Sequence, residues 1–164
     1  MRILLFIAFF FCSASIQAQN FLSANEVNIF SFKTKAGKQV VIAKDTANAY
    51  IVYRYGSANK IEFEFPSNRK TSWTNFKYAF YLRGGGLANE AMDLDYLYFD
   101  NNSFRYVVYN TYFARGNTVK TGIKIIDLKT NKTTNINGIN KTRKGSLSDF
   151  RSNNLLEITD EIFD

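Results

Sequence analysis

Apolar and polar residues alternate with a period of two from residue 27 to about 126, and this pattern constrains the fold more than any other feature. Successive side chains of a strand point to opposite faces, so alternation is typical of strands with one buried face. In one stretch, for example, the charged Lys60 and Glu62 alternate with the apolar Ile61 and Phe63. No segment of comparable length has the 3.6-residue apolar stripe of a helix. We therefore predict an all-β protein.

Turn-forming residues divide this region into eight or nine short strands. Gly37 and the run 56–59 are typical of hairpin turns, because glycine and asparagine tolerate a positive φ. Pro66 is predicted to end a strand, since proline has no N–H to donate to a neighbouring strand. We expect an antiparallel meander that closes into a small barrel or folds into a sandwich, with a short helical turn at 146–150 near the C-terminus. The predicted strands are 27–34, 39–44, 49–55, 60–65, 75–83, 95–99, 103–113, 118–127 and 133–139, with a last short strand at 155–158.

Residues 1–18, MRILLFIAFFFCSASIQA, are predicted to be a cleaved export signal that takes no part in the fold. They combine the positive charge of Arg2, an apolar run, and small or polar residues that end at Ala18. The run is about ten residues long, shorter than the roughly 20 apolar residues that span a bilayer, and a retained N-terminal anchor is the alternative. Cleavage after Ala18 would leave a single β-rich domain, 19–164, in the periplasm or outside the cell.

Without the signal, the chain would be basic and would contain neither cysteine nor histidine. Removing Arg2 from the 21 basic residues leaves 20 against 14 acidic residues, a net charge of +6. The only cysteine, Cys12, would be lost, so packing of the 16 Phe and 10 Tyr is the expected source of stability in place of a disulfide. The lack of histidine excludes histidine-dependent triads and histidine-ligated zinc. We expect no cofactor, and a chain without histidine or cysteine favours a binding function over catalysis.

The positive charge has two interpretations. It could mark a surface for nucleic acid, anionic lipid or another acidic partner. Alternatively, it keeps exposed strand faces soluble, and this reading is favoured because the lysines and arginines are scattered along the chain. The only tight basic run is 141–144. Nucleic acid is therefore not the expected partner.

The segment 83–95, RGGGLANEAMDLD, is the strongest local candidate for a functional loop. Its glycines allow a partner to approach the backbone closely. If the segment is extended, two of its three carboxylates, those of Asp93 and Asp95, share a face and could hold a hard cation or act as an acid/base pair. It lacks the spacing of a calcium or phosphate loop, and a plain β connection with ion-paired acids is the alternative. The candidate contact residues are Arg83, Gly84, Gly85, Gly86, Asn89, Glu90, Asp93 and Asp95.

The tyrosines form a second candidate surface. Tyr and Arg are enriched at interface hot spots, and tyrosine stacks on sugars and bases. The alternative is structural, because a tyrosine with its hydroxyl at the rim of a small β fold is ordinary. The lone Trp73, between two predicted strands, is expected to fill the core. The tyrosines are Tyr50, Tyr53, Tyr55, Tyr78, Tyr81, Tyr96, Tyr98, Tyr106, Tyr109 and Tyr112.

The order of export signal, β meander and central Tyr-, Arg- and Gly-rich stretch resembles the small periplasmic inhibitors and immunity-type proteins of Gram-negative bacteria, such as the lysozyme inhibitors with a compact β-barrel. The segments 50–55, YIVYRY, and 81–86, YLRGGG, carry the resemblance. This chain departs from the pattern because it would have no disulfide once the signal is removed. Its positive charge also disfavours a strongly basic c-type lysozyme as the partner, since like charges weaken complementarity.

Three functions are thus open. The leading hypothesis is an exported, non-catalytic, monomeric binding protein that blocks or neutralises another protein, neutral or acidic, through the 83–95 loop. The second is a binder of an anionic cell-envelope polymer or lipid through Lys, Arg and Tyr side chains. The third is an enzyme that works through Glu90, Asp93 or Asp95.

Overall fold

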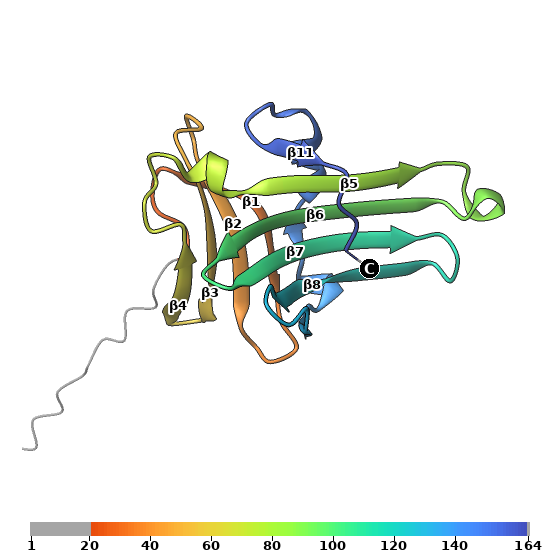
Figure 1. Ribbon diagram of the computed structural model, residues 1–164, viewed down its shortest axis with the longest axis horizontal. Helices are drawn as coiled ribbons and strands as arrows, with labels where there is room; N and C mark the ends of the chain where they lie inside the picture. The colour runs from red at the N-terminus through yellow and green to blue at the C-terminus, as the bar shows by residue number, and fades with distance from the viewer. Residues whose placement is uncertain (1–20, 164) are drawn as a thin grey trace, which may run out of the picture.

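The strands form two sheets, and the computed structural model describes residues 21–163. Figure 1 shows that the strands of one sheet cross those of the other steeply. The five-stranded sheet has the order β10 (Lys144–Gly145), β1 (Glu26–Lys33), β2 (Gln39–Asp45), β3 (Ile51–Ser57) and β4 (Lys60–Phe65). The six-stranded sheet has the order β11 (Glu157–Thr159), β5 (Lys77–Arg83), β6 (Met92–Asn101), β7 (Phe104–Phe113), β8 (Thr118–Asp127) and β9 (Thr133–Asn137).

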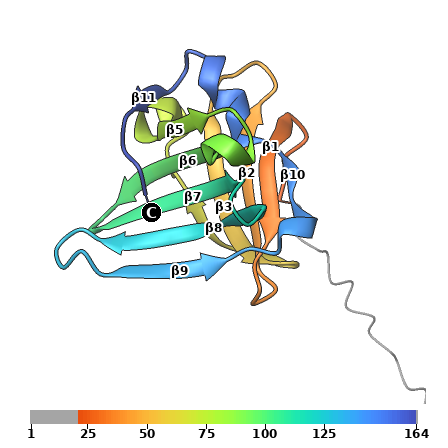
Figure 2. The same ribbon diagram turned by 90° about the vertical axis from the view of Figure 1, so that its right-hand side faces the viewer.

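The all-β prediction is confirmed, and the two sheets form a sandwich rather than a closed barrel. The sheets meet at one corner, where Thr34 forms an isolated antiparallel bridge with Gly138. Figure 2 shows β9 as the lower edge strand of the six-stranded sheet. β1 and β10 of the other sheet lie to its right in this view. Two sheets that pack face to face bury one face of each, which explains the period-two pattern without barrel closure.

The predicted last strand, 155–158, corresponds to β11, whereas β10 is a strand that the sequence does not predict; both pair with distant partners. β10 adds to β1 through the pairs Phe30 with Gly145 and Ser31 with Lys144. β11 lies beside β5 and is parallel to it, so the sheet is not purely antiparallel. β10 has only two residues and so shows no alternation, and the parallel pairing of β11 is specified only by the completed sheet. The remaining strand pairs follow the predicted meander.

Phe99 of β6 lies at the centre of the core between the sheets, and its side chain is 1% exposed. Its ring is stacked 4.2 Å from that of Phe65 and 5.1 Å from that of Tyr106, between ring centroids. Tyr53 and Phe76 also contact it, at 5.2 and 5.1 Å. Each such aromatic pair adds about 0.5–1.5 kcal/mol beyond simple burial. The aromatic content therefore supplies the core, as expected.

Each sheet also has an apolar cluster on the face turned away from the core, which we call its outer face. On the five-stranded sheet, Phe21 covers Val41, Ala43 and Val52. On the six-stranded sheet, the cluster contains Leu94, Tyr96, Tyr98, Val107 and Tyr109, with Phe163 packed against it. The two ends of the described chain therefore each cover one outer face, and Figure 1 shows the C-terminal segment crossing β5, β6 and β7.

Short 3-10 helices connect the strands: η1 (Ser72–Asn75), η2 (Leu87–Asn89), η3 (Asn140–Thr142) and η4 (Leu147–Ser152). The last corresponds to the helical turn predicted near the C-terminus, and the Ser146 hydroxyl caps it by accepting from the Ser148 N–H at 3.1 Å. Trp73 of η1 packs against the core and donates its indole N–H to the Asn48 carbonyl at 2.8 Å. The predicted signal, 1–18, lies outside the described residues.

Candidate functional site

The predicted 83–95 loop divides into two parts in the structure. Its first part forms the tip of the β5–β6 hairpin, at the end of the six-stranded sheet that projects beyond the rest of the molecule (Figure 1). Gly85 and Gly86 have φ values of +96° and +63°, which glycine adopts without steric cost. Asn89 of η2 donates its side-chain amide to the Gly84 carbonyl at 2.8 Å. The tip therefore has a defined conformation with hydrogen bonds of its own.

The charged groups of the tip pair with one another. Arg83 Nε and Nη2 donate to the backbone carbonyl of Glu90 at 3.0 and 2.6 Å. The Glu90 carboxylate lies 3.2 Å from Arg115 Nη1, which comes from the turn between β7 and β8, and 3.7 Å from Arg83 Nη2. Because these side chains are exposed, each pair contributes at most about 1 kcal/mol to stability. Their effect is to join two neighbouring hairpin turns.

Large apolar side chains at the same end are exposed to solvent. Leu82 of β5 is 60% exposed and Leu87 of η2 is 69% exposed, and Tyr81 beside them is also exposed. We call Tyr81, Leu82, Arg83 and Leu87 the tip patch. Tyr81 and Leu82 are successive residues of β5, so they lie on opposite faces of the sheet and the patch includes both faces of its end. Large apolar side chains exposed at one end of a molecule are typical of contact sites for other proteins.

The second part of the predicted loop, Asp93 and Asp95, belongs to β6, where Asp95 is buried and Asp93 is partly exposed. The two carboxylates share a face, as alternation predicts, and η4 brings Arg151 between them. Arg151 Nη2 lies 2.7 Å from Asp95 Oδ1 and also contacts Asp93. Tyr78 donates its hydroxyl to Asp95. We call Tyr78, Asp93, Asp95 and Arg151 the Arg151 cluster.

Burial dominates the electrostatics of the Arg151 cluster. It raises the pKa of Asp95 above its ordinary value of 3.8, although hydrogen bonds from Tyr78 and Arg151 act in the opposite direction. Burial and the neighbouring Asp95 carboxylate also raise the pKa of Tyr78. The arrangement forms an ion pair that closes one end of the core. Among residues 21–163, no group of three or more Asp, Glu, Cys or His side chains is arranged to hold a metal ion.

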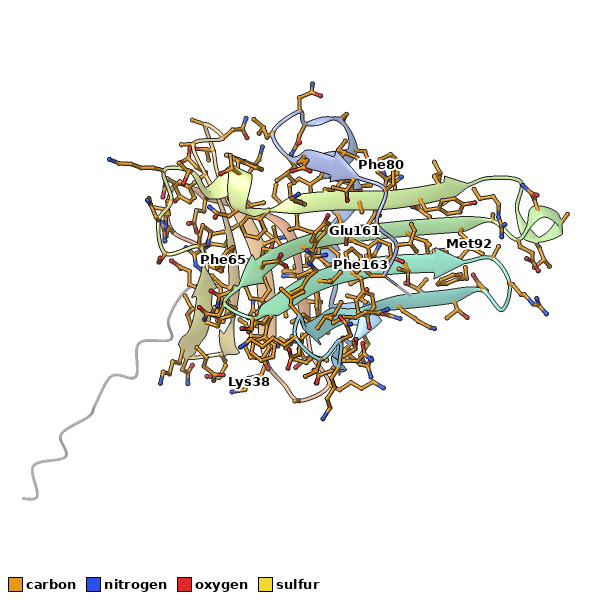
Figure 3. The ribbon with its side chains drawn as sticks, viewed as in Figure 1. Lys38, Phe65, Phe80, Met92, Glu161 and Phe163 are labelled. Atoms are coloured by element: carbon orange, nitrogen blue, oxygen red, sulfur yellow. The ribbon has the colours of Figure 1, made fainter. Side chains whose placement is uncertain are left out.

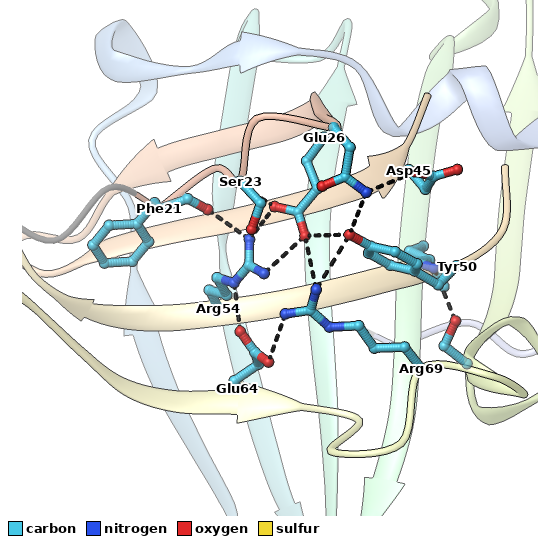
Figure 4. A network of polar contacts seen from close by, with 11 residues as sticks. Phe21, Ser23, Glu26, Asp45, Tyr50, Arg54, Glu64 and Arg69 are labelled. Atoms are coloured by element: carbon cyan, nitrogen blue, oxygen red, sulfur yellow. Dashed lines mark hydrogen bonds and ion pairs between the residues drawn. The ribbon is translucent and has the colours of Figure 1, made fainter. Parts of the chain in front are cut away.

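A second buried cluster, around Arg54, had no signal in the sequence (Figure 4). Glu26, which is fully buried, accepts from Arg54 Nη2 at 2.9 Å and from the Tyr50 hydroxyl at 3.0 Å. Arg54 also donates to Glu64 at 2.6 Å, and Arg69 Nη2 donates to Glu64 at 3.2 Å. We call Glu26, Tyr50, Arg54, Glu64 and Arg69 the Arg54 cluster.

The Arg54 cluster attaches the first described residues to the outer face of the five-stranded sheet. Arg54 Nη1 donates to the Phe21 carbonyl at 2.7 Å, and the Ser23 N–H donates to Glu26 at 2.8 Å. Burial alone would raise the pKa of Glu26, but hydrogen bonds from Arg54 and Ser23 lower it to about 2. The enclosed Arg54 and Glu26 are thus engaged within the protein, and we assign the cluster a structural role.

A groove lies on the outer face of the six-stranded sheet, beside the C-terminal segment. Its volume is about 590 Å³. A hollow of about 330 Å³ next to Glu90 and Met92 shares Phe113 and Lys120 with it, so the groove continues to the base of the tip. We call this region the outer-face groove; its main lining residues are Tyr96, Tyr109, Thr111, Phe113, Lys120, Lys124, Asn135, Asn137 and Phe163.

Cations and aromatic rings lie together in the outer-face groove. Lys120 Nζ lies 5.8 Å from the centroid of the Phe113 ring, and Lys124 Nζ lies 5.9 Å from that of Tyr109. A third hollow, of about 290 Å³, shares Lys120, Tyr109 and Asn137 with the groove and adds Lys35. The groove is therefore basic, with an aromatic floor and amide groups at one side.

The sequence indicated the tyrosines but not the groove. Tyr109 of β7 lies opposite Gly122 of β8, and this register places Lys120 and Lys124 on the same face as the ring. The two lysines were counted among scattered charges because only the register of β7 and β8 brings them to the aromatic residues. Aligning the two predicted strands, 103–113 and 118–127, as a hairpin and comparing the side chains that face each other could have placed Lys120 and Lys124 beside the rings.

Comparisons with known proteins add no relative to this description: no protein-family model, no curated protein and no solved structure matches the chain. Within the part of the chain that the structure describes, no helix is both long and apolar enough to span a membrane.

Proposed function

We propose that this chain is an exported, non-catalytic binding protein that contacts another protein through the tip patch and thereby blocks or neutralises it. The observation that carries the proposal is the exposure of Leu82 and Leu87 on a tip whose backbone and charges are already held by hydrogen bonds. A preorganised apolar surface loses little conformational freedom on binding, which favours affinity.

The charges at the tip support the same function. Arg83 and Arg115 flank the apolar side chains and share a single carboxylate, that of Glu90. Tyrosine and arginine are enriched in protein interfaces relative to the rest of the surface. The net positive charge of the chain favours a neutral or acidic partner, because unlike charges speed encounter and like charges oppose it.

The geometry gives less support to an enzyme that uses the carboxylates of the loop. Asp93 and Asp95 are directed toward Arg151, and Glu90 pairs with Arg83 and Arg115. These acids are therefore engaged in ion pairs within the protein, where their attraction to arginine competes with any role in proton transfer.

The test is affinity capture from cell-envelope extracts at moderate salt, with the captured protein then titrated against purified variants. The double variant Leu82→Ser/Leu87→Ser should weaken binding by more than about tenfold, because burying each leucine contributes on the order of 1.5–3 kcal/mol. Leu128→Ser is the matched control, since Leu128 is also exposed but follows the opposite end of β8. Equal binding by all three proteins, or no captured protein, would reject the proposed contact.

A further inference from the structure

The C-terminal segment shows which chemical groups the outer face of the six-stranded sheet accepts. The ring of Phe163 packs edge-on at 5.4 Å from the Tyr96 ring and 5.0 Å from the Tyr98 ring. The Glu161 carboxylate accepts from Arg105 Nη1 at 2.8 Å, and Lys124 donates to the Phe163 carbonyl. An extended, acidic stretch with an aromatic residue is thus held by rings and cations (Figure 3).

Beyond Phe163, the outer face again presents lysines beside aromatic rings. No other segment of residues 21–163 covers this part of the face. Lys120 is exposed beside the Phe113 ring and has no carboxylate partner within residues 21–163. Lys35 lies at one side of the groove, and Arg115 lies at the end nearest the tip. The surroundings of Lys120 therefore repeat those of Lys124, with the carbonyl acceptor missing.

The charges of the groove select an acidic ligand. Among the described residues, 21–163, that line the groove and its two adjoining hollows, Glu90 is the one acid, and it is already paired with two arginines. Opposed to it are Lys35 and Lys120, whereas Lys124 is already engaged with the C-terminal segment. Because the aromatic floor lowers the local dielectric, a carboxylate here would be attracted more strongly than at an open surface.

We infer that the outer-face groove binds an extended, acidic polypeptide segment that carries an aromatic side chain. This inference rests on the proposed function and names the chemistry of the partner segment that would lie beside the tip patch. The ring of the segment packs against Phe113 and Tyr109, its carboxylates lie at Lys120 and Lys35, and its backbone continues the path of Phe163 across the strands.

The inference is tested with a fluorescein-labelled peptide, acetyl-GEFDEFDG-amide, titrated against the full protein by fluorescence anisotropy. We expect saturable binding that weakens as salt rises, because salt screens the charge attraction. The amide peptide, acetyl-GQFNQFNG-amide, and the alanine peptide, acetyl-GEADEADG-amide, should each bind at least about tenfold more weakly, a loss equal to about 1.4 kcal/mol.

Protein variants locate the binding. Lys120→Glu should weaken binding of the acidic peptide by at least about tenfold. Lys70→Glu, at an exposed lysine that precedes η1, is the matched control and should bind like the parent. Phe113→Leu keeps the apolar character but removes the ring, and it supplies a second readout should Lys120→Glu fail to fold.

Each contrary outcome is distinct. Binding that is unaffected by Lys120→Glu and Phe113→Leu, or absent from the folded parent protein, would overturn the inference. So would tighter, Lys120-dependent binding of an acidic polysaccharide such as polygalacturonate, or evidence from light scattering that a second copy fills the groove. If capture still depends on Leu82 and Leu87 while the peptide does not bind, the proposed function stands and this inference falls.

Discussion

The Arg54 cluster and the Arg151 cluster are built from the same groups, yet they differ in how completely the protein encloses them. Each joins a central arginine to two carboxylates and a tyrosine, and the Arg54 cluster adds a second arginine, Arg69. The side chains of Arg54 and Glu26 are 3% and 0% exposed, whereas those of Arg151 and Asp93 are 21% and 44% exposed. The first is covered by the N-terminal segment, and the second lies where the projecting end of β6 leaves the core.

The difference shows why paired carboxylates in a sequence are weak evidence for chemistry. Asp93 and Asp95 stand two residues apart and suggested a cation site or an acid/base pair, but they serve one arginine from η4. Glu26 and Glu64 are far apart in the sequence and suggested nothing, although they surround the more deeply buried ion pair. The spacing of two acids in the sequence shows whether their side chains share a strand face. Their burial and their ion-pair partners in the folded protein determine whether they could bind a ligand or only stabilise the fold.

The largest effect is expected from breaking the enclosed cluster. Arg54→Met takes from the buried Glu26 its closest cation and leaves only the partly exposed Arg69, 3.6 Å away, so we expect a loss of about 3–5 kcal/mol in the free energy of unfolding. Urea unfolding followed by circular dichroism measures it. Lys77→Met, which breaks the exposed pair with Glu157, is the control and should change the free energy of unfolding far less, because solvent screens that pair. Similar losses in the two variants would contradict the difference in enclosure.

A smaller effect is expected from breaking the partly open cluster. Arg151→Met removes charged hydrogen bonds from Asp95, but water can approach Asp93, so the loss should be about 1.5–3 kcal/mol. The same unfolding assay measures it. A loss as large as that of Arg54→Met would mean that both clusters are equally enclosed.

Acidification should change the stability contributions of the two clusters in opposite directions, by up to about 1.4 kcal/mol per pH unit for each group. The pKa of Glu26 is lowered to about 2, so its contribution is present above its ordinary pKa of 4.5 and is lost as the pH falls toward 2. The pKa of Asp95 is raised, so folding favours its protonated form; that contribution is present below its ordinary pKa of 3.8 and is lost as the pH rises through the folded value.

Two variants separate these contributions in unfolding curves measured between about pH 6 and about pH 3. The destabilisation caused by Glu26→Gln should shrink on acidification, because the ionised form of Glu26 is the one that folding favours. Asp95→Asn should become less favourable relative to the parent protein over the same range. Parallel trends in the two variants would show that the clusters have the same electrostatic character.

Local patterns predicted most of the strands, and long-range pairing decided the rest. The bounds of β4 and β8 agree with the alternation in 60–65 and 118–127, because turns and proline end both strands locally. The pairing of β11 with β5 has no local signature, since three residues cannot express a period. For the candidate site, alternation placed Asp93 and Asp95 on one face, but Arg151 comes from a helix more than fifty residues later.

The outer-face groove could not be predicted from the sequence, because it too depends on how separate strands pair. Its rings come from β6 and β7 and its lysines from β8, so each strand alone presents an ordinary exposed face. The groove follows from the register of β7 and β8, which places the lysines beside the rings. No short stretch of the sequence taken alone shows how these strands pair.

The position of β10 and β11 in the sheets has a consequence for the order in which the protein can fold. β1 near one end of the chain pairs with β10 near the other, and β5 receives its outer neighbour from the last described residues. Neither sheet can therefore be completed while the C-terminal third is still being synthesised. Such distant contacts close large loops late and slow the folding of a β domain. A chain with this topology stays incomplete, and so unfolded for longer, until its final strand is available.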